Sequence, residues 1–199
     1  MARVGTDNAI RVARRMGISS PLRDYCSLVL GAQNLTPLEL AGAYATLASG
    51  GIHCQPTLLT QITDPTGRVL YHGRPACRRV LDPQVAATAD AILQGVVRPG
   101  GTGFRAAIGR PVAGKTGTTS GYTDAWFTGF TPQLATSVWV GNPARQTPMT
   151  DRFGGGPVFG GTFPALIFHD YMTAALAGQP IADLPGAPPE QAAAPPGQR

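Results

Sequence analysis

Residues 109–126 read GRPVAGKTGTTSGYTDAW, and they decide the fold because they match two patterns that belong to different folds. Residues Gly109 to Thr116 match the phosphate-binding P-loop pattern G-x-x-x-x-G-K-[ST]. Residues 115–117 also read Lys-Thr-Gly, and in this second interpretation they lie on a strand that lines a substrate cleft. The residues around Lys115 therefore have to distinguish a nucleotide-binding loop from a strand.

A P-loop requires a helix directly after its lysine, because backbone N–H groups at the start of that helix bind the phosphates. Residues 116–124 instead read TGTTSGYTD, with four Thr and two Gly in nine positions, and none of these is a good helix former. Pro111 also removes one N–H donor from the supposed loop. We therefore favour the strand over the P-loop.

On a strand, each of these residues has a chemical use. Lys115 supplies a fixed positive charge, and Gly117 lets the backbone come close to a substrate. Thr116 and Thr118 share one face of an extended strand, so their hydroxyls can act together. With Lys115 they can hold a carboxylate, each charge-assisted hydrogen bond contributing about 1.5–3 kcal/mol. The N–H of Thr118 is expected to face a developing oxyanion.

The composition is that of a globular protein with many turns: 43% hydrophobic, 14% charged, 26 Gly and 19 Pro. The net charge of +5 predicts a scattered basic surface, because no basic run is interleaved with aromatic residues as in nucleic-acid-binding proteins. Of the 16 basic residues only Lys115 is a lysine, and the others are arginines. Its compact ammonium group differs chemically from their planar guanidinium groups. No apolar run reaches the roughly 18–20 residues that span a bilayer, and the N-terminus lacks a signal-peptide core.

Helix signals occur in four places. The clearest is TPLE, in which Thr36 caps the helix, Pro37 suits its first position and Glu39 completes a capping box. A cap at Thr6 or Asp7 begins the first helix, with Ile10, Val12, Ala13 and Met16 on its apolar side. The predicted helices cover about residues 7–16, 37–49, 83–97 and 164–177.

Strand signals predict a hairpin and a sheet. Residues 57–62 and 68–72 flank Asp-Pro-Thr-Gly, which is a good turn sequence. Residues 109–116, 124–130 and 134–142 follow one another with short turns, so they are expected to be neighbours in an antiparallel sheet.

The three cysteines, Cys26, Cys54 and Cys77, fit no zinc-binding spacing. Two alternatives remain open: three small buried thiols, or one disulfide with one thiol left over. Cys54 and Cys77 bracket the predicted hairpin, which could bring them together.

The Lys-Thr-Gly tripeptide does not stand alone. It continues as K-T-G-T-T, and DAWFTGFTP follows at residues 124–132 and VWVG at 138–141. This succession resembles the penicillin-binding transpeptidase domain of the bifunctional, class A peptidoglycan synthases. The resemblance covers about residues 4–178 and includes the segments 27–51 and 159–178.

The resemblance implies an α+β fold of the serine β-lactamase and D,D-peptidase type, with an antiparallel sheet flanked by helices and its N-terminal part missing. It makes residues 1–178 the C-terminal part of a transpeptidase domain. Residues 179–199 are rich in Pro and Ala and are predicted to form a disordered tail.

Two motifs of the family are absent from this sequence. The family carries Ser-x-x-Lys, which holds the acylating serine, and Ser-x-Asn, which supplies proton-transfer partners. Lys115 is the only lysine, and the position three residues before it is Val112. No serine of the chain begins Ser-x-Asn. We therefore expect a chain that supplies the Lys-Thr-Gly wall of the site and is inactive alone, because no nucleophile is presented.

By resemblance, the complete protein cross-links peptidoglycan. A serine attacks the D-Ala-D-Ala bond of one stem peptide, an amine of another stem peptide takes the acyl group, and β-lactams block the first step. The resemblance implies no metal and no cofactor. The implied partners are stem peptides, β-lactams and the missing N-terminal part of the domain. The implied location is the outer face of the bacterial cytoplasmic membrane, where an anchor outside this chain holds the protein.

The resemblance assigns the site residues as follows. Lys115 and Thr118 are the catalytic candidates, through cleft electrostatics and the oxyanion hole. The candidates for substrate binding are Lys115, Thr116, Gly117, Thr118, Thr119, Tyr122 and Asp124. Two other functions remain as alternatives: a non-catalytic binding or assembly module with part of this fold, and the P-loop nucleotide-binding protein.

Overall fold

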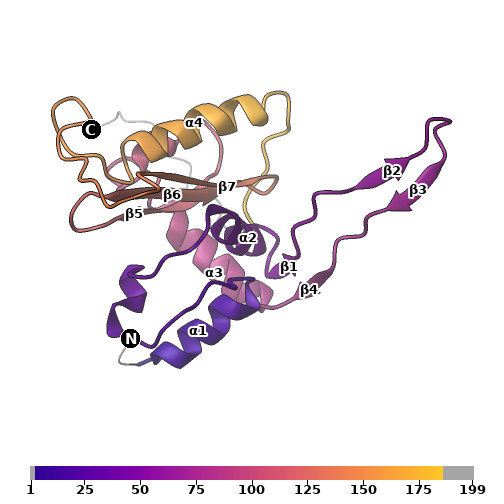
Figure 1. Ribbon diagram of the computed structural model, residues 1–199, viewed down its shortest axis with the longest axis horizontal. Coiled ribbons are helices and arrows are strands. Elements are labelled where there is room, and N and C mark those ends of the chain that lie inside the picture. The colour runs from indigo at the N-terminus through magenta and orange to yellow at the C-terminus, as the bar shows by residue number, and fades with distance from the viewer. Residues whose placement is uncertain (1–2, 186–199) are drawn as a thin grey trace, which may run out of the picture.

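The computed structural model describes residues 3–185 and shows a mixed α+β architecture (Figure 1). The helices are α1 (Thr6–Arg15), α2 (Pro37–Ala48), α3 (Pro83–Gln94) and α4 (Phe163–Ala175), with two 3-10 turns, η1 (Cys26–Leu30) and η2 (Phe104–Ala106). The strands are β1 (Ile52–Cys54), β2 (Gln61–Thr63), β3 (Val69–His72), β4 (Cys77–Arg79), β5 (Ala113–Thr118), β6 (Asp124–Phe130) and β7 (Ala135–Gly141). Within the described part of the chain, the helices are too short or too polar to cross a membrane.

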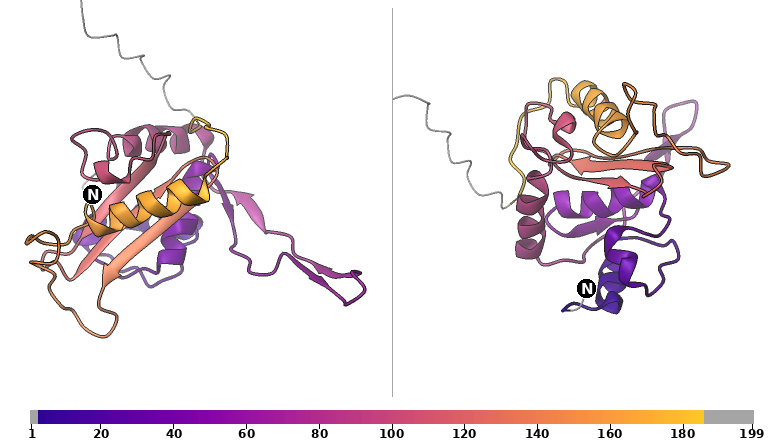
Figure 2. Two further views of the ribbon diagram at one scale, coloured as in Figure 1. Left: turned by 90° about the horizontal axis from the view of Figure 1, so that it is seen from above. Right: turned by 90° about the vertical axis from the view of Figure 1, so that its left-hand side faces the viewer.

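The central sheet is antiparallel, with the strand order β5-β6-β7 that the short intervening turns predicted. Helix α4 covers one face of the sheet, and α2 and α3 lie on the other (Figures 1 and 2). The sheet is therefore the middle of three layers. Its two faces can bury apolar side chains alternately along each strand.

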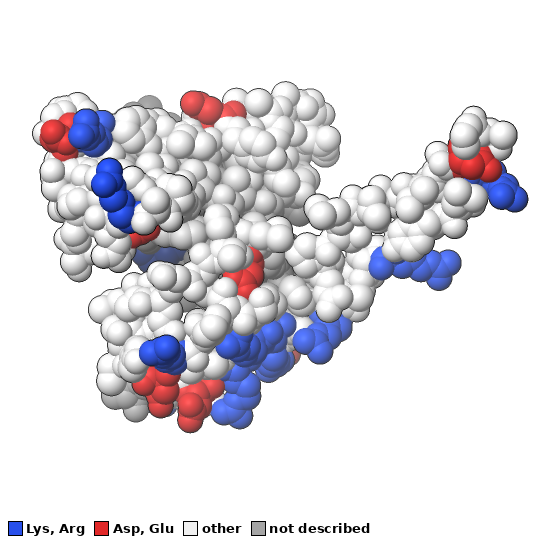
Figure 3. All heavy atoms as spheres, viewed as in Figure 1, with Lys and Arg blue, Asp and Glu red and all other residues white. Residues whose placement is uncertain are grey.

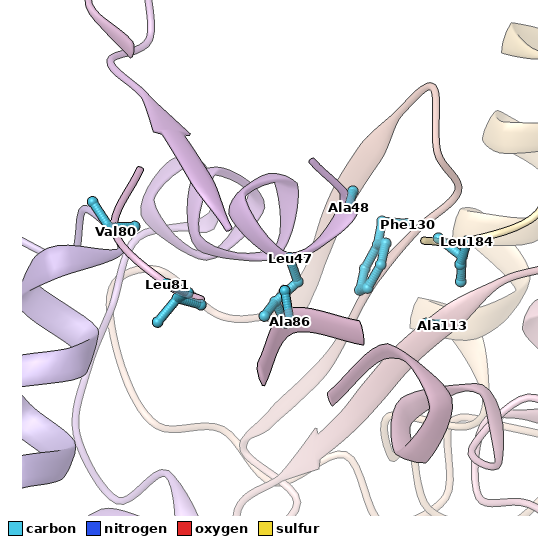
Figure 4. Packing of buried hydrophobic residues seen from close by; sticks show 8 residues of the cluster. All are labelled: Leu47, Ala48, Val80, Leu81, Ala86, Ala113, Phe130 and Leu184. Atoms are coloured by element: carbon cyan, nitrogen blue, oxygen red, sulfur yellow. The ribbon is translucent and has the colours of Figure 1, made fainter. Parts of the chain in front are cut away.

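Each face of the sheet has its own aromatic centre. Phe130 of β6 meets Tyr44 of α2 with ring centroids 6.0 Å apart, in the cluster that Figure 4 shows with Leu47, Leu81 and Ala113. On the opposite face, Phe127 packs edge-on against Phe168 of α4 at 4.8 Å. Phe127, Phe130 and Phe168 are all fully buried. Side chains of this size dominate core energetics, so these layers hold the sheet in place.

The capping box before α2 forms as predicted. The Thr36 hydroxyl accepts from the Glu39 N–H at 3.2 Å, and the Thr36 N–H donates to the Glu39 carboxylate at 3.1 Å. The same carboxylate accepts from the N–H and hydroxyl groups of Ser19 and Ser20, at 2.5–2.7 Å. Glu39 therefore also fastens the segment after α1 to the start of α2, a link that the sequence pattern did not reveal.

Several local predictions are wrong. The cap of α1 is Gly5, with no side-chain cap, because the Thr6 hydroxyl bonds to Asp24 instead. Val12 is 39% exposed, since α1 packs only loosely and buries none of its residues. Helix α3 ends at Gln94, and residues 95–97, which were predicted to continue it, form turns. The short strands β1 and β4 were not predicted, because three residues leave little pattern.

The predicted hairpin exists as an arm that projects from the body of the molecule (Figures 1 and 2). Strands β2 and β3 are exposed along their whole length. At the base of the arm, β1 pairs with β4, and Cys54 and Cys77 lie opposite each other and form a disulfide. Of the two alternatives for the cysteines the disulfide is therefore confirmed, and the third cysteine, Cys26, is free and exposed.

The segment after α4 includes a core residue. Leu184, which we assigned to the tail, is only 2% exposed and belongs to the cluster that contains Ala113 and Phe130. An isolated leucine among Pro and Ala residues has no apolar period, so its burial could not be predicted. The rest of the predicted tail, residues 186–199, lies outside the described residues.

Asp90 of α3 is a buried carboxyl group without a partner. It has no exposed surface, and neither of its oxygens accepts a hydrogen bond within the described residues. Burial disfavours the charged form and raises the pKa of Asp90 to about 7, from an ordinary value of 3.8. Between these two values the folded chain holds a proton that the unfolded chain has released, so the free energy of unfolding falls as pH rises.

Replacing Asp90 by Asn is expected to remove this part of the pH dependence, because Asn has a similar shape and does not titrate. The measurement is urea unfolding at about pH 5 and about pH 7.5. Between these two pH values the free energy of unfolding should fall by about 2 kcal/mol more in the wild-type chain than in Asp90→Asn. Equal losses in the two proteins would show that Asp90 is not protonated in the folded state.

Candidate active-site wall

The Lys-Thr-Gly residues lie on β5, an edge strand of the sheet among the described residues. The Thr119 N–H donates to the Asp124 carbonyl at 3.1 Å, which makes these two residues a hydrogen-bonded pair at the end of the ladder. Such pairs alternate along an antiparallel ladder. Lys115 and Gly117 therefore bond to β6, whereas Thr116 and Thr118 turn their N–H and C=O groups to the free edge.

The side chains of Thr116 and Thr118 share the face of the sheet that α4 covers, as the alternation of the strand requires. The Thr116 hydroxyl lies 2.9 Å from the hydroxyl of Thr102. The Thr118 hydroxyl accepts from the N–H of Gly160 at 3.1 Å, which leaves its own hydrogen free to donate. Both threonines are thus fixed from behind by the segments that precede η2 and α4.

Lys115 starts from the opposite face of β5, the face of Thr128 and Trp126. Its ammonium group nevertheless bends to the edge of the strand and donates to the Thr116 carbonyl at 2.9 Å. The side chain is exposed, so the charge is available to solvent. The structure therefore brings the ammonium to the same edge as the outward Thr118 N–H, although the lysine and the threonines point to different faces.

Gly117 is surrounded on both faces of the strand. A Cβ atom at this position would lie 3.1 Å from the Cβ of Trp126, its cross-strand neighbour. On the other face Gly160 packs so closely that its own added Cβ would lie 2.8 Å from the Gly117 carbonyl oxygen. A side chain at Gly117 would therefore press on Trp126, which would have to shift by a few tenths of an ångström, and this packing favours glycine here apart from any close approach of a substrate.

Thr119, Tyr122 and Asp124 belong to the turn between β5 and β6. The Thr119 hydroxyl accepts the N–H groups of Thr123 and Asp124, each at 3.0 Å. The Asp124 carboxylate accepts from the Thr123 hydroxyl at 2.8 Å and from the Trp139 indole N–H at 2.9 Å. Tyr122 adopts φ +54°, a left-handed conformation that is uncommon for residues other than glycine. Asp124 therefore organises the turn and ties it to β7.

Two cavities lie in the helical part of the chain, and residues 115–118 line neither of them. One is an apolar cavity of about 230 Å³ between α1 and η1. The other, of about 920 Å³, lies between α1, α2 and the base of the arm. The candidate site is thus an exposed strand edge, and it does not form part of either cavity.

Two residues that position this edge, Thr102 and Gly160, were not predicted from the sequence. Thr102 lies 14 residues from its partner and Gly160 lies 42 residues from its own. Their sequence contexts, GGTG and FGGT, indicate tight turns and nothing about which strand they approach.

Solved structures with the same fold are penicillin-binding transpeptidases. PonA1 from Mycobacterium tuberculosis is similar with a TM-score of 0.78 and 28% identity, over 90% of this chain and 52% of that one. Penicillin-binding protein 1A from Haemophilus influenzae also gives a TM-score of 0.78, with 27% identity over 93% of this chain and 33% of that one. The fold is therefore part of a penicillin-binding-protein transpeptidase fold.

The sequence comparisons agree with the structural ones. Residues 15–163 match the family described as the penicillin binding protein transpeptidase domain. The chain is 38% identical to penicillin-binding protein 1A of Aquifex aeolicus over 73% of its length, and 33% identical to penicillin-binding protein 2D of Bacillus subtilis over 89%. The chain belongs to the transpeptidase-domain family of class A penicillin-binding proteins. It spans 20% and 26% of the length of these two relatives.

Removing the Asp124 carboxylate is expected to loosen the turn behind the Lys-Thr-Gly edge. Asp124→Ala should lower the free energy of unfolding by about 2–3 kcal/mol, since the Trp139 N–H and the Thr123 hydroxyl lose a charged acceptor. Urea unfolding followed by tryptophan fluorescence measures this. The control is Asp151→Ala, an exposed acid that forms an ion pair with its exposed neighbour Arg152, for which we expect a change within about 0.5 kcal/mol. Equal effects of the two substitutions would contradict the role of Asp124.

Proposed function

We propose that this chain forms the Lys-Thr-Gly wall of a peptidoglycan D,D-transpeptidase site. The observation that carries the proposal is the free edge of β5. There the Lys115 ammonium lies against the Thr116 carbonyl, next to the outward N–H of Thr118. A positive charge and an N–H donor that faces away from β6 on the same edge suit a substrate that carries a carboxylate and develops an oxyanion. Membership of the family supports the same chemistry.

In the proposed reaction, a stem peptide ending in D-Ala-D-Ala lies along this edge as an added strand. Its terminal carboxylate binds at Lys115 and receives hydrogen bonds from the hydroxyls of Thr116 and Thr118. When the acylating serine attacks the peptide carbonyl, the Thr118 N–H donates to the oxyanion. Because Thr102 and Gly160 hold the two threonines, these donors need little reorganisation during the reaction.

The nucleophile and its proton-transfer partners are proposed to come from a part of the domain outside these 199 residues. The chain contains no Ser-x-x-Lys and no Ser-x-Asn. It also spans only 20% and 26% of the length of the two relatives named above. By this account the chain binds β-lactams covalently only together with that other part, and the site lies outside the cytoplasmic membrane, as the resemblance implies.

A non-catalytic binding or assembly module is the second candidate. The missing serine motifs favour it, because a chain without the nucleophile can keep the fold and lose the chemistry. The two candidates differ in one property: only the first requires that the β5 edge still supports acylation when a serine is supplied.

Grafting tests this property. In a chimera, residues 15–163 of this chain replace the matching segment of the penicillin-binding protein 1A of Aquifex aeolicus. The remainder of the chimera is the A. aeolicus protein. We expect this chimera to react covalently with a fluorescent penicillin. Lys115→Ala in the chimera should slow the labelling by about 100-fold, because the charge at the strand edge is lost. Arg74→Ala, which removes an exposed charge from the arm, should label at the unchanged rate.

The outcomes separate the candidates. Near-normal labelling of Lys115→Ala would refute the proposed role of the lysine. A chimera that melts cooperatively but does not label would favour the non-catalytic module. The 199-residue chain alone should remain unlabelled in the same assay.

A further inference from the structure

The larger cavity lies away from the Lys-Thr-Gly edge, where α1, α2 and the base of the arm meet. It has a volume of about 920 Å³, within the usual range for small-molecule sites. Its charged lining and its histidine come from four elements: Arg14 of α1, Glu39 of α2, His53 of β1 and Arg78 of β4. The disulfide joins these two strands at the next residue pair, so His53 and Arg78 are held opposite each other.

His53 is the buried polar group of this cavity, with 8% of its surface exposed. Its Nδ1 lies 3.2 Å from the Thr46 hydroxyl, and that hydroxyl donates its only hydrogen to the Gly42 carbonyl. Nδ1 must therefore carry the proton and donate to Thr46. The second ring nitrogen, Nε2, has no partner among residues 3–185, and it is not sealed from solvent. Nε2 is thus free to contact a molecule in the cavity.

Two arginines bring unused donors to the same space. Among the described residues Arg14 uses only its Nη1, which donates to the Ile18 carbonyl at 2.8 Å. Arg78 is exposed and forms no hydrogen bond or ion pair within the described residues. Figure 3 shows basic side chains gathered over this junction of α1 with the base of the arm. Guanidinium groups match carboxylate and phosphate oxygens in pairs of hydrogen bonds.

The one acid in the lining does not neutralise these arginines by pairing with them. The Glu39 carboxylate already accepts from the N–H and hydroxyl groups of Ser19, Ser20 and Thr36. Burial works against ionisation, but these hydrogen bonds hold the pKa of Glu39 well below its usual range. Glu39 is therefore a fixed negative charge with no free acceptor, and the cavity keeps two positive charges against one.

We propose that this cavity binds a small oxyanion, a carboxylate or a phosphate group, between Arg14 and Arg78 and against Nε2 of His53. Binding should couple to a proton on His53. Burial first, and the charge of Arg78 second, lower the pKa of His53, so the ring is neutral in the free chain near neutral pH. A bound anion offsets Arg78 and favours a proton on Nε2, which then donates to the anion. Arg14, Arg78 and Glu39 are the charged groups that line the cavity with His53.

The test titrates the 199-residue chain with sodium phosphate and, separately, with sodium acetate at constant ionic strength. Amide and imidazole NMR signals are followed. We expect saturable shifts centred on His53 with at least one of the two anions, and the stronger of the two identifies the preferred oxyanion. Arg78→Gln should weaken binding by at least about tenfold, since it removes charge-assisted hydrogen bonds. The matched control Arg74→Gln removes an exposed arm charge that does not line the cavity, and should bind as the wild type does.

The pH profile is the second readout. With acetate, which stays ionised over this range, affinity should rise as pH falls from about 8 to about 6, and His53→Gln should remove this dependence. Far-UV circular dichroism and the thermal midpoint confirm that each variant is folded. The proposal is overturned if neither anion saturates the His53 shifts, if Arg74→Gln weakens binding as much as Arg78→Gln, or if His53→Gln keeps the full pH dependence.

Discussion

The register of β6 between β5 and β7 determines which backbone groups face the open edge of the sheet and which side chains enter each core. Successive residues of β6 form their backbone hydrogen bonds alternately with β5 and with β7. The Thr119–Asp124 pair at one end therefore determines, for every residue of β5 back to Ala113, whether its N–H and C=O groups face β6 or the open edge. This alternation turns the N–H groups of Thr116 and Thr118 to the free edge. A slip of one residue would turn Lys115 and Gly117 outward instead and move every side chain of β5 to the other face.

Packing fixes this register from both sides of the sheet. Phe127 and Phe130 leave β6 on opposite faces and are buried against α4 and α2, so neither can exchange faces without losing a core. Asp124 fixes the turn at the strand end, and Gly160 fixes Thr118 from behind. The site edge is therefore held by packing and hydrogen bonds although it is exposed. The oxyanion cavity depends on a different device, the disulfide that holds β1 against β4.

The sequence predicted those features whose cause is local. The capping box of α2, the turn of the arm and a strand through Lys115 follow from residues a few positions apart, and the structure confirms them. The strand was predicted over residues 109–116 and instead covers Ala113–Thr118. The sequence did not predict that Thr102 and Gly160 support β5, that Leu184 is buried, or that Arg14 and Arg78 line one cavity. These depend on contacts between distant segments, and no residue pattern within one segment encodes them. The roles of Lys115 and Thr118 in catalysis remain proposals from the family resemblance and the edge geometry.

Amide hydrogen exchange along β5 tests whether the N–H groups of Thr116 and Thr118 face the open edge, because it reports each backbone N–H separately. In the 199-residue chain, the amides of Lys115 and Gly117 should exchange slowly, since they bond to β6. The amides of Thr116 and Thr118 should exchange at least about tenfold faster, since they face the open edge. Equal protection at all four positions, or slower exchange at Thr116 and Thr118, would contradict the register and with it the proposed site.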